Sequence, residues 1–317
     1  MEGLPPIVVV GSINQDLIIE ADRFPQAGES LLGSQAVYAN GGKGANQAVA
    51  VARLGGDVCL VGKVGSDAFG ERMRVDLMDC GVNTRWLSVA QGSSTGVAII
   101  LLVQGENAIV VSPGANNLVF TQDVNLAKEV FQPGAILLLQ LEIPIETIAH
   151  TMRIAREHSM TIILDPGPAQ KCSPDVLALA DYITPNETEA HMLTGIEVNS
   201  SQGVQRAAEV LHGYARKGVI MKLGDAGSWV FSGNRQEQIP ALHVNVRDTT
   251  AAGDAFCGAL SLALASGMDV FESARFANMI GAITVTRLGA QPSLPSRIEV
   301  DGFYSEHNLP VKLPWRS

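Results

Sequence analysis

The 317-residue sequence has no long hydrophobic run, and its longest unbroken apolar stretch is only Val97 to Val103. A membrane-spanning helix needs roughly 20 such residues, so no membrane partner is expected. The sequence begins without the basic segment followed by an apolar one that is typical of a secretory signal. We therefore expect a cytoplasmic protein.

Cysteines are few and basic runs are missing. Cys59, Cys80, Cys172 and Cys257 lie far apart and form no Cys-x-x-Cys pair, so we expect reduced thiols buried as small apolar residues. Lys and Arg total 22 against 32 Asp and Glu, which gives a net charge of −10. Without a basic stripe, this balance excludes a nucleic-acid polymer as partner but allows one small anion.

Short apolar runs alternate with helical stretches along most of the chain. Continuous apolarity over four to six residues is typical of strands covered on both faces, and the alternation predicts a parallel sheet with crossover helices. The predicted strands are Ile7–Val10, Val58–Val61, Ala135–Leu139, Thr161–Leu164, Tyr182–Thr184 and Val219–Leu223. The predicted helices are Ala45–Leu54, Gly70–Asp79, Ile145–His158, Glu187–Thr194 and Ser201–Lys217.

Two regions, about 13–40 and 93–113, carry strand-like runs with no helix long enough for a crossover. They predict a small antiparallel sheet inserted into the larger fold. Both alternating faces of Val97–Val103 are apolar, so one face must cover a site or contact a second copy of the chain.

The segment Asp248–Leu260 carries the strongest local signal. Small residues before an apolar helix leave backbone N–H groups unpaired at a helix N-terminus, which attracts an anion. Asp254 at its edge could accept a proton from a hydroxyl that attacks a phosphoryl group. It could equally serve only to complement the helix dipole, and the segment alone leaves both interpretations open.

Two other segments have both a functional and a purely structural interpretation. The loop Gly41–Gln47 lacks the Walker pattern, and it is either an ordinary strand-to-helix turn or a close backbone approach to a polyhydroxylated ligand. Asn186 and Glu189 form a capping box, which needs no function, although they also follow a parallel strand where Mg²⁺ bound to phosphates could be held.

Taken in order, these motifs resemble the ribokinase-like carbohydrate kinases. The resemblance rests on Gly11–Asp16, Gly41–Gln47, Gln140–Glu142, Pro185–Glu189 and Asp248–Gly258, and it spans roughly residues 7 to 304. The segment Gly289–Ser293 narrows the resemblance to the ribokinases within that family. The resemblance implies one three-layer α/β/α sandwich over residues 1–317 with a central, mostly parallel sheet and a β lid, a homodimer through the lids, and ATP-dependent phosphorylation of the ribose 5-hydroxyl.

The family pattern also implies the site residues. Asp254 would be the general base, and backbone amides at Ala251, Ala252 and Gly253 would form an anion hole that extends over 251–254. The sugar would be bound by Asn14, Gln15, Asp16, Gly42, Lys43, Gly44, Ala45, Asn46 and Glu142. The nucleotide site would include Asn186, Lys222, Leu223, Gly224, Asp225, Ala226, Gly227, Gly253 and Asn278, with Glu189 supporting Mg²⁺. A K⁺ site would use Asp248, Thr250, Thr284, Arg287, Gly289 and Ser293.

Two positions depart from the ribokinase pattern. Lys222 stands where ribokinases usually carry Thr, and Asp165 stands where they usually carry Asn. Both positions lie toward the expected nucleotide site, so they affect the contacts with the nucleotide more than the choice of sugar. A 2-deoxyribokinase or another pentose or nucleoside kinase of this family remains an alternative. A silent sugar-binding regulator is the alternative of a different class.

Overall fold

The computed structural model describes residues 3–104, 106–307 and 309–316. Thirteen strands lie within these ranges: β1 Ile7–Val10, β2 Asn14–Glu20, β3 Val37–Gly41, β4 Val58–Gly65, β5 Leu87–Ala90, β6 Gly96–Val103, β7 Glu106–Ser112, β8 Ile136–Gln140, β9 Thr161–Asp165, β10 Tyr182–Ile183, β11 Gly218–Lys222, β12 Ser228–Ser232 and β13 Arg235–Ile239.

Ten α-helices and four short 3₁₀ helices connect these strands. The α-helices are α1 Lys43–Arg53, α2 Ala68–Asp79, α3 Thr121–Leu126, α4 Ile145–Glu157, α5 Pro174–Leu177, α6 Glu187–Thr194, α7 Ser201–His212, α8 Ala252–Ala265, α9 Val270–Thr284 and α10 Arg297–His307. The 3₁₀ helices are η1 Gly114–Leu118, η2 Lys128–Val130, η3 Gly224–Ala226 and η4 Gln291–Ser293. No helix in the described ranges is both long and apolar enough to cross a membrane.

The large sheet has nine strands in the order β13-β12-β11-β10-β9-β8-β1-β4-β5. The strands from β11 to β5 pair in parallel, which confirms the mostly parallel sheet. All six predicted strands and all five predicted helices form, with ends that shift by a few residues. The antiparallel β12–β13 edge was not predicted, because Arg235–Ile239 is largely polar.

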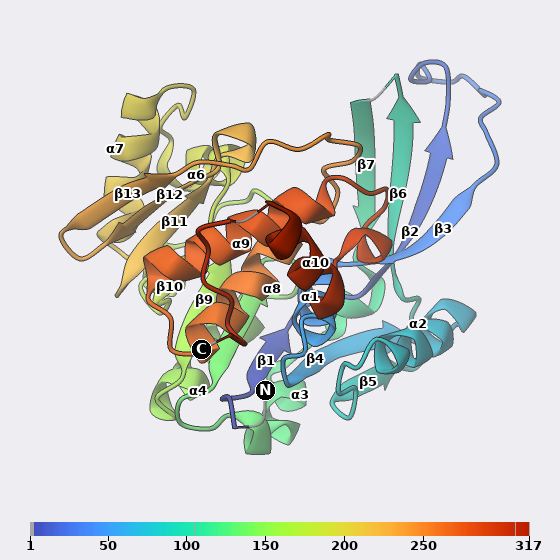
Figure 1. Ribbon diagram of the computed structural model, residues 1–317. Helices are drawn as coiled ribbons and strands as arrows, with labels where there is room; N and C mark the ends of the chain where they lie inside the picture. The colour runs from blue at the N-terminus through green and yellow to red at the C-terminus, as the bar shows by residue number, and fades with distance from the viewer. Residues whose placement is uncertain (1–2, 105, 308, 317) are drawn as a thin grey trace.

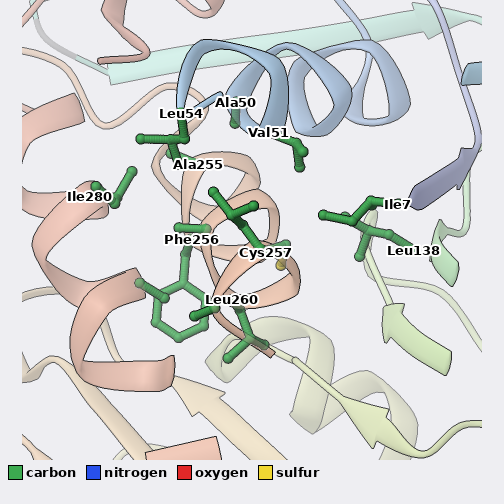
Figure 2. Packing of buried hydrophobic residues seen from close by; sticks show 14 of the residues in the cluster. Ile7, Ala50, Val51, Leu54, Leu138, Ala255, Phe256, Cys257, Leu260 and Ile280 are labelled. Atoms are coloured by element: carbon green, nitrogen blue, oxygen red, sulfur yellow. The ribbon is translucent and has the colours of Figure 1, made fainter. Parts of the chain in front are cut away.

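Helices cover both faces of this sheet and make three layers (Figure 1). Alternate residues of β1 point to opposite faces: Ile7 and Val9 pack with α1, α8 and α9, whereas Val8 and Val10 pack with α4 and α7. Figure 2 shows the first core, where Ile7 lies close to α1 and α8. The strands therefore have no solvent-exposed face, as their unbroken apolarity predicts.

The second sheet has four strands in the order β3-β2-β6-β7 and projects from one end of the large sheet (Figure 1). Its strands fall in the two predicted regions, except that β3 extends to Gly41 and residue 105 lies outside the described residues. The prediction of an antiparallel sheet is wrong for the central pair, because β2 and β6 are parallel. Both strands leave the carboxyl edge of the large sheet, and therefore they run outward side by side.

The two faces of this small sheet carry different residues. Asp16, Ala98 and Val111 are paired across it and lie on one face, whereas Leu17, Ile99 and Val110 lie on the other. Val110 is 68% exposed on the Leu17 face, and Val111 is 45% exposed on the Asp16 face. Both faces are thus apolar, as the sequence predicts, and the chain itself leaves part of each uncovered.

All four cysteines are free thiols. Cys59 and Cys257 are buried as predicted, but Cys80 and Cys172 are partly exposed, because they lie at the end of α2 and in the loop before α5. Burial and the nearby charge of Asp57 raise the pKa of Cys59 to about 12, so this thiol stays protonated.

Candidate active site

The candidate site lies at the carboxyl edge of the large sheet. Parallel strands end there together, so the residues that follow β1, β8, β9, β10 and β11 are brought to one place. The loop before α1 and the first turn of α8 meet the same edge, where Asn46 contacts Asp254 across 208 positions of sequence.

Backbone geometry fixes the loop before α1. Gly42 has a φ of 87°, and a Cβ there would lie 2.6 Å from the Asn14 nitrogen and 2.9 Å from the Ile13 Cα. A Cβ on Gly41 would meet the Asp16 carboxylate at 2.2 Å. The two glycines therefore let this loop pack directly against the start of β2.

The first turn of α8 is held open by a left-handed residue. Ala251 has a φ of 59°, which is rare for a residue with a side chain. The Ala252 N–H donates to the Thr249 carbonyl oxygen at 3.2 Å. In the described ranges, no protein acceptor contacts the next two N–H groups, those of Gly253 and Asp254. These two are therefore available to an anion.

Asp254 is 5% exposed and is held by two amides. Asn46 Nδ2 donates to Oδ2 at 2.9 Å, and Gln47 Nε2 donates to Oδ1 at 3.1 Å. Burial is the largest influence on its pKa, and despite the opposing charge of Lys43 the pKa is raised. A buried carboxylate with a raised pKa is a better proton acceptor than an exposed one.

The side facing the small sheet is rich in groups that can bind hydroxyls. Burial, followed by the charges of Glu142 and Asp254, raises the pKa of Asp16 to about 7. Glu142 accepts hydrogen bonds from the Ser12 hydroxyl and, at 3.1 Å, from the Lys43 backbone N–H. Asn46 Oδ1 is buried with no partner in the described part of the chain, so a ligand hydroxyl would satisfy it.

Gln15, Gly44 and Ala45 are also buried here, but their roles differ from those of their neighbours. Gln15 Nε2 donates to the Ala39 carbonyl at 2.6 Å and therefore ties β2 to β3. Gly44 and Ala45 bond to Ser12, which fixes α1 against the start of the small sheet.

On the other side of Asp254 lies a cavity of about 690 Å³. It is lined by most of the residues expected for a nucleotide: Asn186, Glu189, Lys222, Gly224, Asp225, Gly227, Gly253 and Asn278. Leu223 and Ala226 do not line it. The Leu223 side chain is buried in the core, and its backbone N–H bonds to Gly227, so it shapes the loop.

Five charged side chains meet between the two sides. Lys222 Nζ lies 2.6 Å from Asp165 Oδ1 and 3.8 Å from Glu189 Oε2. Lys43 Nζ lies 3.7 Å from Asp165 and 3.8 Å from Asp254. Burial opposes the charge of each lysine, but the carboxylates outweigh it and raise both lysine pKa values. Lys222 and Lys43 likewise keep the pKa of buried Asp165 low.

The residues expected for K⁺ gather beyond the first turn of α8. Asp248 Oδ1 accepts from the Thr250 N–H at 2.9 Å, and Asp248 Oδ2 accepts from the Gly289 N–H at 2.7 Å. Thr284 and Ser293 are buried nearby and bond to the carbonyls of their own turns. The Arg287 side chain instead pairs with Glu299 at 2.9 Å, so only its backbone could contribute. Asp248 thus links the segment before α8 to Gly289, and a cation role for these residues stays a prediction.

Sequence reasoning missed several residues of the site. Asn116 in η1 donates to Asn14 Oδ1 at 2.7 Å and accepts from the Ile13 N–H at 2.9 Å, so it braces the start of β2. Gln47 bridges Asp254 and Asp165. The remaining cavity lining is mostly apolar and comes from the segment after β13, as with Leu242, Val244 and Val246, and from α8 and α9. No motif marks Asn116, whereas Gln47 belongs to the loop already singled out.

Comparison with known proteins matches residues 5–297 to the model of the pfkB family of carbohydrate kinases. The chain belongs to the pfkB family. It is 40% identical over 311 residues to a ribokinase from Schizosaccharomyces pombe, covering 94% of this chain and 98% of the relative. It is 39% identical over 294 residues to a Haemophilus influenzae ribokinase, covering 92% and 96%.

Two further pfkB relatives inform the choice of sugar. A deoxyribokinase from Salmonella typhi is 33% identical over 292 residues, covering 92% of this chain and 95% of the relative. A solved structure of Arabidopsis thaliana ribokinase complexed with ribose and ATP is 33% identical, with a TM-score of 0.86 over 94% of this chain and 98% of that one. The chain is therefore a ribokinase-like sugar kinase, and its small sheet corresponds to a lid.

Proposed function

We propose that this protein transfers a phosphoryl group from ATP to the 5-hydroxyl of D-ribose. The observation that carries the proposal is the place of Asp254 between a hydroxyl-binding side and a 690 Å³ cavity. Its carboxylate would accept the hydroxyl proton as the oxygen attacks the γ-phosphorus and ADP leaves. The N–H groups of Gly253 and Asp254 would bind the charge on the transferring phosphoryl group.

The sugar would lie between the lid and α1. Asn14, Asp16 and Glu142 would accept or donate to its hydroxyls, with Lys43 and Asn46 from α1. The unpartnered Asn46 Oδ1 supports this placement. Each buried group that a poorer sugar leaves unmatched would cost about 1–3 kcal/mol, which is how ribose would be selected.

ATP would occupy the cavity with its phosphates toward Gly253 and its base toward the apolar residues after β13. Glu189 lines the cavity while its Oε2 accepts from the Asn186 N–H, so it would support Mg²⁺ through water. Bound Mg²⁺ would neutralise charge on the phosphates. The Arabidopsis relative is complexed with ribose and ATP, which supports ATP and ribose as the two substrates.

A monovalent cation would act at a distance from the substrates. The carboxylate of Asp248 already joins the segment before α8 to Gly289, and burial of a K⁺ beside it would stiffen that link. The left-handed Ala251 would then keep the anion hole in shape. The protein should therefore be more active in K⁺ than in Na⁺.

The test is an assay of the purified protein with ATP, Mg²⁺ and K⁺ against ribose, 2-deoxyribose, fructose and adenosine. We expect the highest kcat/KM on ribose, and lower activity when Na⁺ replaces K⁺. Preference for 2-deoxyribose or adenosine would favour the alternative kinases, and sugar binding without turnover would favour a regulator. Equal activity in both cations would remove the K⁺ site.

Asp254→Asn tests the general base. Turnover should fall at least about 100-fold, while ribose binding measured by calorimetry survives in weakened form. Asp79→Asn, at an exposed acid that ends α2, is the matched control and should leave turnover unchanged. Near-normal turnover in Asp254→Asn would show that Asp254 only complements the helix dipole.

A further inference from the structure

A buried ion pair spans the carboxyl ends of two strands that are not neighbours. Lys222 ends β11 and Asp165 ends β9, with β10 between them, and their Nζ and Oδ1 atoms are 2.6 Å apart. Asp165 is completely buried, whereas the Lys222 side chain is 12% exposed and faces the nucleotide cavity. Only the cationic end of this pair can therefore reach a ligand.

Asp165 is held so firmly that it can orient the ammonium group. Its second oxygen accepts from Gln47 Nε2 at 2.9 Å and lies 3.7 Å from Lys43 Nζ. An ammonium group has three donors, and the short contact to Asp165 uses one of them. A second is directed to Cys257 Sγ at 4.0 Å, so the third is left for Glu189, 3.8 Å away, or for a group in the cavity.

The ammonium lies beside the first turn of α8. A Cβ built on Gly253 would be 3.6 Å from Lys222 Nζ. The Gly253 N–H has no protein acceptor among the described residues. Lys222 therefore approaches this turn beside Gly253, while Lys43, which also lines the cavity, lies 3.8 Å from Asp254.

We propose that Lys222 is a catalytic residue that binds the phosphoryl group in transfer together with the Gly253 N–H, and that Asp165 is the positioning residue that holds its ammonium there. This inference rests on the proposed function in one respect, the binding of ATP in the cavity. Replacing a buried ion pair with neutral groups is often nearly neutral for stability, so stability alone does not account for the pair.

A double-mutant cycle separates this role from simple charge balance. Lys222→Met leaves Asp165 buried without its partner, so Tm should fall, and kcat and ATP affinity should fall roughly 10- to 100-fold. In Lys222→Met/Asp165→Asn both charges are gone, so Tm should recover while kcat stays low. Asp165→Asn keeps the ammonium but frees it, and it should lower kcat with little effect on the KM for ribose.

Calorimetry with ATP, ADP and adenosine identifies the group that Lys222 contacts. Lys222→Met should weaken ATP most, ADP less and adenosine by no more than about twofold. Lys128→Met, at an exposed position in η2, is the control and should change none of these. Recovery of kcat together with Tm in the double variant, or equal loss for adenosine and ATP, would overturn the proposal.

The two proposals can fail separately. If the wild-type protein binds ATP but does not phosphorylate ribose, the proposed sugar is wrong and the calorimetric cycle still decides the role of Lys222. If it binds no ATP, both proposals are wrong.

Discussion

Asp16 is needed as a carboxylate in the proposed sugar site, yet its surroundings oppose its charge. It is 7% exposed, and burial with the charges of Glu142 and Asp254 raises its pKa from 3.8 to about 7. The folded protein therefore binds a proton at Asp16 that the unfolded chain has already lost between about pH 4 and 7. Stability from this residue is present at low pH and is lost as pH rises through 7.

Asp16→Asn should reverse this loss. The variant should be more stable than the wild-type protein at about pH 8, by at most about 4 kcal/mol, and the difference should shrink as pH falls toward 4. Ribose affinity of the wild-type protein should weaken below about pH 7, by up to tenfold per pH unit, because only the ionised form accepts two hydroxyl donors. The variant should bind ribose weakly at every pH.

Thermal unfolding and calorimetry at several pH values measure both effects. Asp79→Asn, at an exposed acid, should show neither. If the stability difference between Asp16→Asn and the wild-type protein does not change with pH, Asp16 is ionised in the folded protein at every pH measured.

At the scale of single residues, the sequence predicts those site residues that belong to motifs. Asp254, Lys43 and Asn46 lie together as expected, because two glycine-containing loops meet at one sheet edge. Asn116 could not be predicted, since a single Asn in an irregular segment has many surface roles. Asn116 lies 102 positions from Asn14 in the sequence, and only the fold brings the two side chains within hydrogen-bonding distance.

Among the helices and strands, the sequence predicts best those whose pattern has a single physical cause, such as burial on both faces. Apolar runs such as Ile136–Leu139 are buried on both faces, and the sequence predicts them almost to the residue. It does not predict the orientation of β2 and β6, because strand direction depends on where each strand leaves the large sheet. The polar strand β13 pairs through its backbone, which its side chains do not reveal.

The junction between β3 and α1 is an element-scale feature that a single methyl group should disrupt. Gly42→Ala adds a Cβ at a φ of 87° and 2.6 Å from the Asn14 nitrogen. Gly134→Ala, before β8, has a similar φ of 83° but no atom within 4 Å of the new Cβ. Gly134→Ala is therefore the control that measures the backbone strain alone, which costs about 1–2 kcal/mol.

We expect Gly134→Ala to lower the unfolding free energy by that amount and to leave kcat/KM unchanged. Gly42→Ala should lower it at least twice as much and raise the KM for ribose, because Asn14 must move. Denaturant unfolding and steady-state kinetics measure both. Equal losses of stability in the two variants would mean that the loop relaxes around the new Cβ, so that the close contact with β2 costs nothing further.

At the scale of the whole molecule, the two substrates fall to two different parts. The cavity proposed for ATP is built by the large sheet and its helices, whereas the proposed sugar side faces the lid. This division of the substrates stays a prediction that motif order makes. What covers the other face of the lid depends on surfaces far apart in sequence, and the sequence indicates only that both faces of β6 are apolar.

The lid should form a dimer contact, because apolar side chains remain exposed on both of its faces. Ile109 is 51% exposed on the Asp16 face, and Val110 is 68% exposed on the opposite one. Ile109→Glu/Val110→Glu charges both faces, so it should convert a dimer to a monomer whichever face is the contact. Loss of the partner should also raise the KM for ribose, because the lid would close less firmly over the site.

Light scattering during gel filtration measures the mass, and each single variant then assigns the contact to one face. Leu126→Glu, at a residue that is 72% exposed in α3, adds the same charge outside the lid and should leave the dimer intact. Because the lid strands pair through their backbones, the double variant should keep the Tm of the large sheet. A wild-type protein of monomeric mass, or a double variant that is still a dimer, would show that the apolar faces of the lid serve the sugar site alone.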